Sequence, residues 1–254
     1  MNNSAMRVLE ILELFASAPE PLTVSDITRL LGYPKTSVFD IVNILAERGF
    51  IKRDNERAKT YVIGPTAYQV GMSYLAKNDL YSISHPILTS LRDSLGETCY
   101  LAVEEGGYII YLDKVESSQP IRSTCNIGAK NFMYLTGLGK ALLAAMPEDR
   151  VREIAARGMP PRTDTTINTT EALLDEIQEI RKRGCAYDMG EDNSYVRCAA
   201  APVRGRDNEP VAAVSVSMLD AAFTDGMKER ATREVIAAAK EISRGLGWRG
   251  NELY

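Results

Sequence analysis

The pattern of hydrophobic and polar residues predicts three short helices near the beginning of the chain. Apolar residues recur at helical spacing over residues 6–16, 24–31 and 35–48. A T-x-x-D capping signature begins at Thr23 and marks the start of the second helix, and residues 32–34 form a tight turn before the third. Two short helices joined by such a turn are typical of a helix-turn-helix motif.

After Gly49 the pattern changes to the alternation that is typical of strands. Two short runs, 50–53 and 60–63, flank a charged loop, and basic residues outnumber acidic ones by five to two over residues 48–59. A basic hairpin that follows a helix-turn-helix is the order of a winged helix-turn-helix domain. We therefore predict a DNA-binding domain over residues 1–64, with a double-stranded DNA operator as its partner.

The third helix and the hairpin would supply the contacts to DNA. Four apolar residues at helical spacing, from Val38 to Leu45, define the buried stripe of this helix and leave its polar side exposed. On that side an Asn can read adenine, and an acid can accept a hydrogen bond from cytosine. An ordinary solvated polar face is the alternative. The predicted DNA-binding residues are Lys35, Thr36, Ser37, Phe39, Asp40, Asn43, Arg53, Arg57 and Lys59.

Residues 65–79 predict a linker helix with apolar residues on more than one side. Such a helix packs either against its copy in a dimer or against its own domain. The rest of the chain, residues 80–254, mixes helices with strands, and strands that follow one another in hairpins indicate an α+β domain with an antiparallel sheet. The predicted strands span residues 98–104, 108–115, 121–125, 198–204 and 211–219.

Composition and charge are those of an ordinary globular protein of 254 residues with a net charge of −4. No apolar run reaches the length that spans a membrane, and the chain does not open on a secretory signal. We therefore expect a cytoplasmic protein without a membrane partner.

Cysteine and histidine usage narrows the possible chemistry. The four cysteines, Cys99, Cys125, Cys185 and Cys198, are widely spaced, and His85 is the only histidine. This spacing disfavours a zinc site, and the single histidine disfavours a hydrolase that needs a histidine base. We expect free thiols, no metal and no cofactor.

Two segments offer groups for a small ligand. Residues 137–141 read GLGKA, which lacks the Ser or Thr that a phosphate-binding P-loop carries after its Lys. The free N–H groups of a helix that begins there can still hold a small anion. In the strand 211–219, Ser215 and Ser217 point to the side opposite the apolar face, either toward water or into a ligand pocket.

Several short runs match one family in their order and spacing. The runs are residues 45–51, 62–65, 96–101, 107–115, 136–144, 163–167, 183–188, 198–203 and 211–217, with Gly128 placed before the fifth run. Each run is weak alone, but in this order they are specific. From Met6 to Leu246 the chain resembles the isocitrate lyase regulator (IclR) family of bacterial transcription factors.

The resemblance implies a winged-helix domain, a linker helix and a C-terminal effector domain with a GAF-like fold. It also implies a dimer or tetramer and, as in many members, a response to a small organic acid. The positions of the family's pocket correspond here to Gly137, Leu138, Asp188, Cys198, Ser215 and Ser217. Asp40 replaces an Arg that is common in the recognition helix. Phe132 and Tyr134 replace a Pro and a His, which would suit an aromatic or unusual ligand and adds Tyr134 to the expected effector-binding residues.

The sequence as a whole predicts an allosteric transcriptional regulator, a homodimeric or homotetrameric repressor controlled by a small carboxylic acid. The effector would change the relative DNA affinity of two dimer arrangements. We expect no enzymatic activity. The main alternative is a Cys-dependent amidase or hydrolase that uses Cys198 with Lys140 or an acid as the base. An architectural DNA-binding protein without a ligand would instead fill its second domain with bulky apolar side chains.

Overall fold

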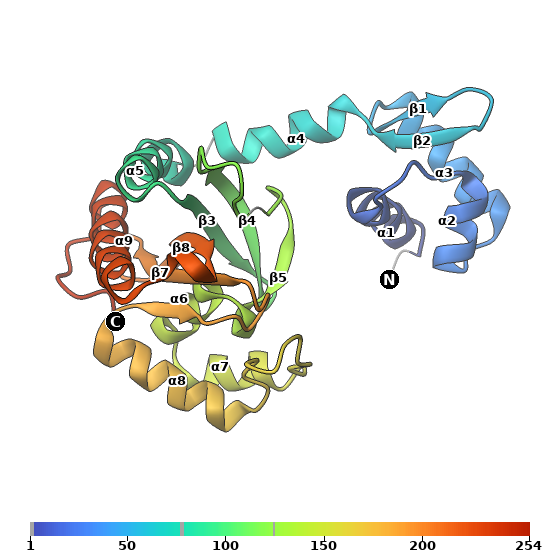
Figure 1. Ribbon diagram of the computed structural model, residues 1–254. Coiled ribbons are helices and arrows are strands. Elements are labelled where there is room, and N and C mark those ends of the chain that lie inside the picture. The colour runs from blue at the N-terminus through green and yellow to red at the C-terminus, as the bar shows by residue number, and fades with distance from the viewer. Residues whose placement is uncertain (1–2, 77–78, 124) are drawn as a thin grey trace. The chain divides into compact units, whose positions relative to one another are not determined.

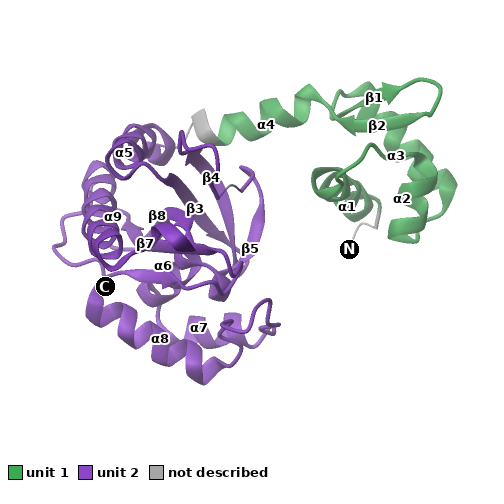
Figure 2. Ribbon diagram, in the orientation of Figure 1, with its two compact units in different colours: residues 1–77 green, residues 78–254 purple. Residues whose placement is uncertain are grey.

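The chain folds into two compact units, residues 1–77 and 78–254, which Figure 2 shows in different colours. The structure is a computed structural model, and it describes residues 3–76, 79–123 and 125–254. It confirms the expected fold class, because a helix-turn-helix unit is followed by an α+β unit with an antiparallel sheet.

The first unit consists of three helices, a hairpin and a fourth helix (Figure 1). In chain order these are α1 (Asn3–Ser17), α2 (Val24–Leu31), α3 (Lys35–Glu47), β1 (Ile51–Asn55), β2 (Thr60–Ile63) and α4 (Pro65–Ala76). α4 covers most of the predicted linker helix, but residues 77 and 78 lie outside the described part of the chain. The domain division at 1–64, 65–79 and 80–254 stays a prediction.

Local hydrogen bonds and one glycine set the two ends of α2. Thr23 Oγ1 accepts a hydrogen bond from the N–H of Asp26, and the Asp26 carboxylate accepts one from the N–H of Thr23, each at 3.1 Å. Gly32 ends the helix in the left-handed region at φ 71°, where a side chain would be strained. The chain can therefore turn sharply into α3, as the sequence predicts.

The core of this unit joins the first three helices to the hairpin. The side chains that are fully buried together are Ile11, Ile27, Val38, Val42 and Ile51. Backbone hydrogen bonds between Leu22 and Tyr61, at 3.0 and 2.8 Å, attach the hairpin to the chain just before α2. The predicted buried stripe of α3 is confirmed, so the polar face of that helix is left to solvent.

The second unit places its helices on both faces of one sheet. Its helices are α5 (Asp79–Leu95), α6 (Gly137–Ala145), α7 (Glu148–Ala155), α8 (Thr170–Arg183) and α9 (Asp225–Gly245). Its strands are β3 (Thr98–Glu105), β4 (Tyr108–Val115), β5 (Lys130–Phe132), β6 (Ala186–Asp188), β7 (Val196–Arg204) and β8 (Pro210–Leu219). In the described residues all neighbours are antiparallel, in the order β5-β4-β3-β8-β7-β6.

α5 and α9 cover one face of this sheet, and α6, α7 and α8 lie on the other (Figure 1). The alternation predicted for β8 is confirmed, because Val214 and Val216 are buried against α5 and α9. Ser215 and Ser217 point to the opposite face, where both are buried. Their hydroxyl groups therefore lie in the layer that contains α6 and do not face water.

The strand predicted at residues 121–125 is wrong. Residues 121–123 and 125 are irregular, residue 124 lies outside the described part of the chain, and the edge beside β4 is taken by β5. The backbone of this segment bonds to a side chain instead of a ladder. The hydroxyl of Tyr100 accepts a hydrogen bond from the N–H of Cys125 at 2.9 Å and donates one to the carbonyl of Ser123 at 3.3 Å.

Candidate functional site

The polar face of α3 presents most of the predicted DNA-binding residues to solvent. Thr36, Asp40 and Asn43 are exposed along one side of the helix, with Lys35 at its first turn and Phe39 about half exposed at 53 %. Ser37 is partly withdrawn, since its Oγ accepts a hydrogen bond from Arg7 Nη1 at 3.1 Å. Exposed Asn, Asp and Thr side chains on one helix face are groups that can contact base edges in a major groove.

The hairpin presents a second group of predicted contacts. Arg53, Arg57 and Lys59 are all exposed. The Asn55 side chain orders the turn by accepting hydrogen bonds from the N–H groups of Arg57 and Ala58, at 2.9 and 3.0 Å. Arg57 and Lys59 thus project from a loop that is ordered by its own bonds.

Arg53 is engaged within the hairpin itself. Its Nη1 lies 2.6 Å from Glu56 Oε2, and its guanidinium lies over the ring of Tyr61. Exposed ion pairs of this kind contribute little free energy. Arg53 can therefore exchange Glu56 for a DNA phosphate at small cost.

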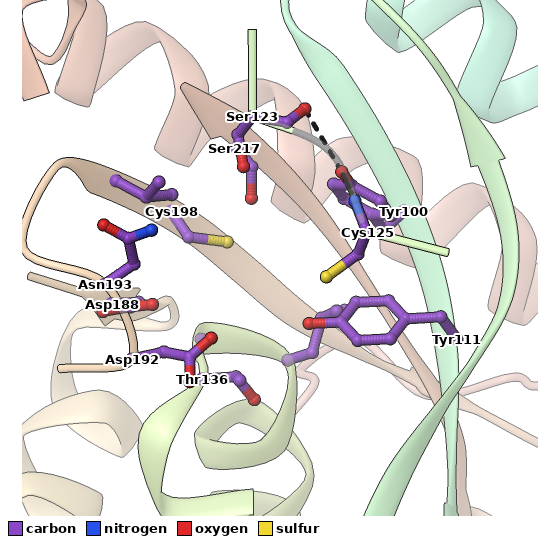
Figure 3. Close-up of a pocket in the computed structure, with 13 residues that line it drawn as sticks. Tyr100, Tyr111, Ser123, Cys125, Thr136, Asp188, Asp192, Asn193, Cys198 and Ser217 are labelled. Carbon is purple, nitrogen blue, oxygen red and sulfur yellow. Dashed lines mark hydrogen bonds between the residues drawn. The ribbon is translucent and has the colours of Figure 1, made fainter. Parts of the chain in front are cut away.

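The second unit contains a cavity of about 100 Å³ beside the beginning of α6. A water molecule needs about 10–15 Å³ on this measure, so the cavity has room for a ligand of several non-hydrogen atoms. Polar and apolar groups share its wall, as is usual for small-molecule sites. The lining residues are Tyr100, Tyr111, Ser123, Cys125, Thr136, Gly137, Leu138, Asp188, Asp192, Asn193, Val196, Cys198 and Ser217 (Figure 3).

The beginning of α6 supplies hydrogen-bond donors to this cavity. Thr136 caps the helix, because its Oγ1 accepts a hydrogen bond from the N–H of Gly139 at 3.0 Å. The N–H groups of Gly137 and Leu138 have no partner inside the helix by geometry, and both residues line the cavity. A Cβ on Gly139 would collide with the backbone of Met133, so only glycine lets the helix begin this close to the preceding turn.

Three neighbouring strands supply the opposite wall. Asp188 of β6 is the register partner of Cys198 on β7, and Cys198 is the register partner of Ser217 on β8. Register partners point to the same face of a sheet, so a carboxyl, a thiol and a hydroxyl form one row across the wall. Residues far apart in the chain are brought together here by strand pairing alone.

Asp188 sits in a buried network of charges. Its Oδ1 accepts hydrogen bonds from the N–H groups of Gly190 and Glu191, at 2.9 and 2.8 Å. Burial, and next the charge of Glu191, raise the pKa of Asp188 to about 7. Glu191 is itself ion-paired with Lys140 of α6, and these two side chains are 5 % and 2 % exposed. The Lys140 ammonium also lies 3.9 Å from Glu176 of α8.

The family comparisons agree with both halves of this architecture. The model of the IclR helix-turn-helix domain matches residues 4–55, and that of the bacterial transcriptional regulator IclR C-terminal domain matches residues 72–244. The chain belongs to the IclR family. It is 31 % identical over 247 residues to the transcriptional repressor IclR of Escherichia coli K12, across 96 % of this chain and 90 % of that protein.

Solved structures of IclR proteins have the same fold. The Thermotoga maritima IclR is 30 % identical to this chain, with a TM-score of 0.77 over 98 % of this chain and 100 % of that one. An IclR homologue from Microbacterium hydrocarbonoxydans in complex with 4-hydroxybenzoate is 18 % identical, with a TM-score of 0.83 over 96 % and 99 %. This IclR-family chain is thus a transcriptional regulator with a helix-turn-helix DNA-binding domain.

Five of the seven residues expected to bind an effector in this IclR-family protein line the cavity: Gly137, Leu138, Asp188, Cys198 and Ser217. Ser215 is fully buried next to Ser217 on β8 but does not reach the lining. Tyr134 is directed elsewhere. It lies in the 3-10 turn Met133–Leu135, where its side chain is buried and its hydroxyl donates a hydrogen bond to the carbonyl of Pro160 at 2.7 Å.

Several lining residues were not predicted from the sequence. Tyr100 and Tyr111 come from β3 and β4, whereas Asp192 comes from the loop after β6. Asp192 accepts a hydrogen bond from Asn131 at 3.0 Å and is ion-paired with Arg162. Alternation along β3 could have placed Tyr100 on the α6 side of the sheet, but no pattern in the sequence indicates the loop residues.

The hydroxyls of a Thr-rich segment hold that loop in place. Thr165 donates a hydrogen bond to the carbonyl of Gly190 at 2.9 Å, and Thr166 donates one to the carbonyl of Glu191 at 2.7 Å. The N–H groups of these same two loop residues are bonded to Asp188. The run 163–167, which contributed to the family resemblance, thus positions the turn that orients Asp188.

The thiol of Cys198 is not an activated nucleophile. Burial raises the pKa of Cys198 to about 12, so the thiol is protonated at neutral pH. The expected bases are engaged elsewhere: Lys140 is ion-paired with Glu191, and the acid nearest to Cys198, Asp188, accepts two backbone hydrogen bonds. Among the described residues no group of three or more His, Cys, Asp or Glu side chains is placed to hold a metal. None of the helices in the described ranges is long and apolar enough to cross a membrane.

Proposed function

We propose that this IclR-family regulator is a repressor whose DNA affinity is controlled by a small carboxylic acid bound in the cavity beside α6. One observation carries the proposal: Gly137 and Leu138, whose N–H groups have no partner within α6, line the same cavity as Ser217 of β8. Backbone donors at a helix N-terminus stabilise a bound anion, and a hydroxyl can add a third hydrogen bond.

The effector-binding residues in this proposal are Gly137, Leu138, Asp188, Cys198 and Ser217. Ser215 lies on the same face of β8 but off the cavity lining, and Tyr134 is left out because its hydroxyl bonds to the carbonyl of Pro160. The cavity wall includes polar groups and is not filled by bulky apolar side chains, which disfavours an architectural protein without a ligand. The 4-hydroxybenzoate complex of a protein with this fold makes that acid a useful first probe.

The DNA-binding surface in this proposal is the polar face of α3 together with the hairpin. Repression is suggested by the name of the Escherichia coli relative. Tyr68, Val70 and Tyr74 leave a large apolar surface exposed on α4, which suits pairing with a second copy in a homodimer or homotetramer. An operator on bacterial DNA would place the protein in the cytoplasm.

We propose no catalytic role for Cys198. Burial keeps the Cys198 thiol protonated, and a protonated thiol is a poor nucleophile for acyl transfer. An alkylation assay tests this: Cys198 should react with iodoacetamide far more slowly at pH 7.5 than a free cysteine does. Rapid alkylation of Cys198, together with turnover of simple amides, would favour the amidase.

Replacing Asn43 by Ala should change which DNA sequences the protein prefers. Asn43 is exposed on the polar face of α3, where a bidentate contact to adenine contributes about 1–3 kcal/mol of discrimination. In a selection from random DNA, the variant should tolerate substitutions at one position of each half-site that the wild type rejects. Glu47→Ala, on the same face but at the last turn, is the control. An Asn43→Ala variant with wild-type preferences would remove Asn43 from the base-reading set.

Replacing Ser217 by Ala should weaken binding of a carboxylic acid by roughly 10- to 150-fold, since one hydrogen bond to a charged group is lost. Ser215→Ala is the matched control, because it also removes one hydroxyl from this face of β8, but at a residue that does not line the cavity. Calorimetric titration of both variants checks the difference. Equal losses of affinity in the two variants would mean that the serines act on the structure of the wall.

A further inference from the structure

The two oxygens of the Asp188 carboxyl have different surroundings. Oδ1 accepts two backbone hydrogen bonds, from Gly190 and Glu191. No hydrogen bond to Oδ2 is found among the described residues, although Asp188 is only 5 % exposed and lies on the cavity wall near Asp192 (Figure 3). Oδ2 is not among the fully buried polar atoms that lack a partner, so it is reachable from the cavity, whereas Oδ1 is already occupied by two N–H donors. Oδ2 is thus the atom where a proton would be accommodated best.

The charged groups around Asp188 do not neutralise the negative charge of its carboxylate. On the α6 side Lys140 is matched by Glu191, and Glu176 of α8 also lies beside that ammonium. The loop after β6 adds Asp192, which is paired with Arg162. β7 adds the protonated thiol of Cys198, and burial also raises the pKa of Tyr111 on β4 and of the Cys125 thiol, so both are neutral. None of the described lining residues is a Lys or Arg.

An incoming carboxylate would therefore meet a second negative charge across a small cavity. Two carboxylates that share one water-poor site do not both stay ionised, because the repulsion favours a proton bound between them. A ligand hydroxyl, by contrast, could donate a hydrogen bond to ionised Asp188 without any proton. The number of protons taken up on binding therefore distinguishes a ligand carboxylate at Asp188 from a ligand hydroxyl.

We propose that Asp188 takes up one proton when a carboxylic acid anion occupies the cavity, and that its Oδ2–H then donates a hydrogen bond to the ligand carboxylate. This inference rests on the proposed acid effector, and it specifies the protonation state of Asp188 in the complex. The proton comes from solvent and adds to Oδ2, and no bond of the ligand forms or breaks. The N–H groups of Gly137 and Leu138 and the protonated Asp188 then surround the ligand with donors.

The expected pH dependence follows from proton linkage. The pKa of free Asp188 is about 7, and a bound anion raises it further. Below this pH the carboxyl is already protonated, so binding takes up almost no proton and is strongest. Above it, the dissociation constant should rise about tenfold per pH unit while uptake approaches about one proton per ligand.

Calorimetric titration of the full chain tests this, with acetate, pyruvate and 4-hydroxybenzoate as the probes. Each titration is run at pH 6.0 in MES and in Bis-Tris, and at pH 8.0 in HEPES and in Tris, because buffers with different ionisation enthalpies reveal the number of protons bound. We expect uptake of about 0.1 proton at pH 6.0 and close to one at pH 8.0. Asp188→Asn keeps a hydrogen-bond donor at this position without titrating, so it should bind the acid with no proton uptake and with an affinity that does not change with pH. Asp192→Asn removes the neighbouring carboxylate and should leave the proton count unchanged.

Each outcome has a distinct meaning. Binding of an acid without proton uptake at pH 8.0 would overturn the inference and leave the proposed acid effector standing. Uptake that persists in Asp188→Asn, or that disappears in Asp192→Asn, would assign the proton to another group and also overturn it. If the wild type binds none of the three acids, this result would contradict the proposed effector class itself. If Asp188→Asn does not fold, the number of protons that the wild type takes up at the two pH values still tests the inference.

Discussion

Lys140→Met should lower the free energy of unfolding of the unit 78–254 by about 3–5 kcal/mol. The Lys140 side chain is 2 % exposed and ion-paired with that of Glu191, which is 5 % exposed. Its removal leaves the Glu191 carboxylate buried without a counterion beside Asp188, and a buried unpaired charge is among the most destabilising single changes in a protein. Trp248 is the only tryptophan and is buried in this unit, so its fluorescence follows unfolding in denaturant directly.

Two controls separate the charge effect from lost packing. Lys140→Met combined with Glu191→Gln removes both charges and keeps an acceptor for the N–H of Met189, so it should recover most of the loss. Lys182→Met breaks an exposed pair with Glu179 and should cost less than about 1 kcal/mol. A Lys140→Met variant no less stable than Lys182→Met would show that the buried pair does not hold the cavity wall.

Arg53→Ala with Arg57→Ala should weaken DNA binding by roughly 10- to 100-fold at low salt, to specific and random duplexes alike. Both side chains are exposed on the hairpin, and their positive charges suit phosphate contacts that carry no sequence information. Each lost contact should also reduce the slope of log K against log salt by about 0.9. Fluorescence anisotropy over a range of salt concentrations measures both quantities.

The matched control for the hairpin is the pair Arg152→Ala and Lys182→Ala, which removes two exposed cations from α7 and α8 of the other unit. This control lowers the net charge equally but should leave the salt slope near the wild-type value. If the hairpin variant kept the wild-type slope, Arg53 and Arg57 would not contact DNA in the complex.

The helix-turn-helix unit could be predicted from sequence because its signals are local. The cap at Thr23, the left-handed Gly32 and the buried stripe from Val38 to Leu45 each lie within a few residues of the structure they set. Of the strands in the second unit, the long ones were predicted for the same reason. β5 and β6 have three residues each and exist only because a neighbouring strand pairs with them, so no local pattern marks them.

The cavity could be predicted only in part, because strand register creates it. Asp188, Cys198 and Ser217 carry no signal alone, and only the resemblance brought them together before the pairing of β6, β7 and β8 was known. Tyr134 lies three residues before Gly137 in the chain, but the 3-10 turn directs its ring toward Pro160. Closeness in sequence to the helix start was therefore a poor guide to the lining.

DNA affinity measured with and without a bound acid examines the proposed regulation. A duplex selected by the full chain from random DNA is titrated by fluorescence anisotropy, first alone and then with the acid that calorimetry shows to bind. A saturating acid should change the dissociation constant of the DNA complex by at least about fivefold, and Ser217→Ala should need more acid for the same change. An unchanged dissociation constant with the cavity occupied would contradict control of DNA binding by this site.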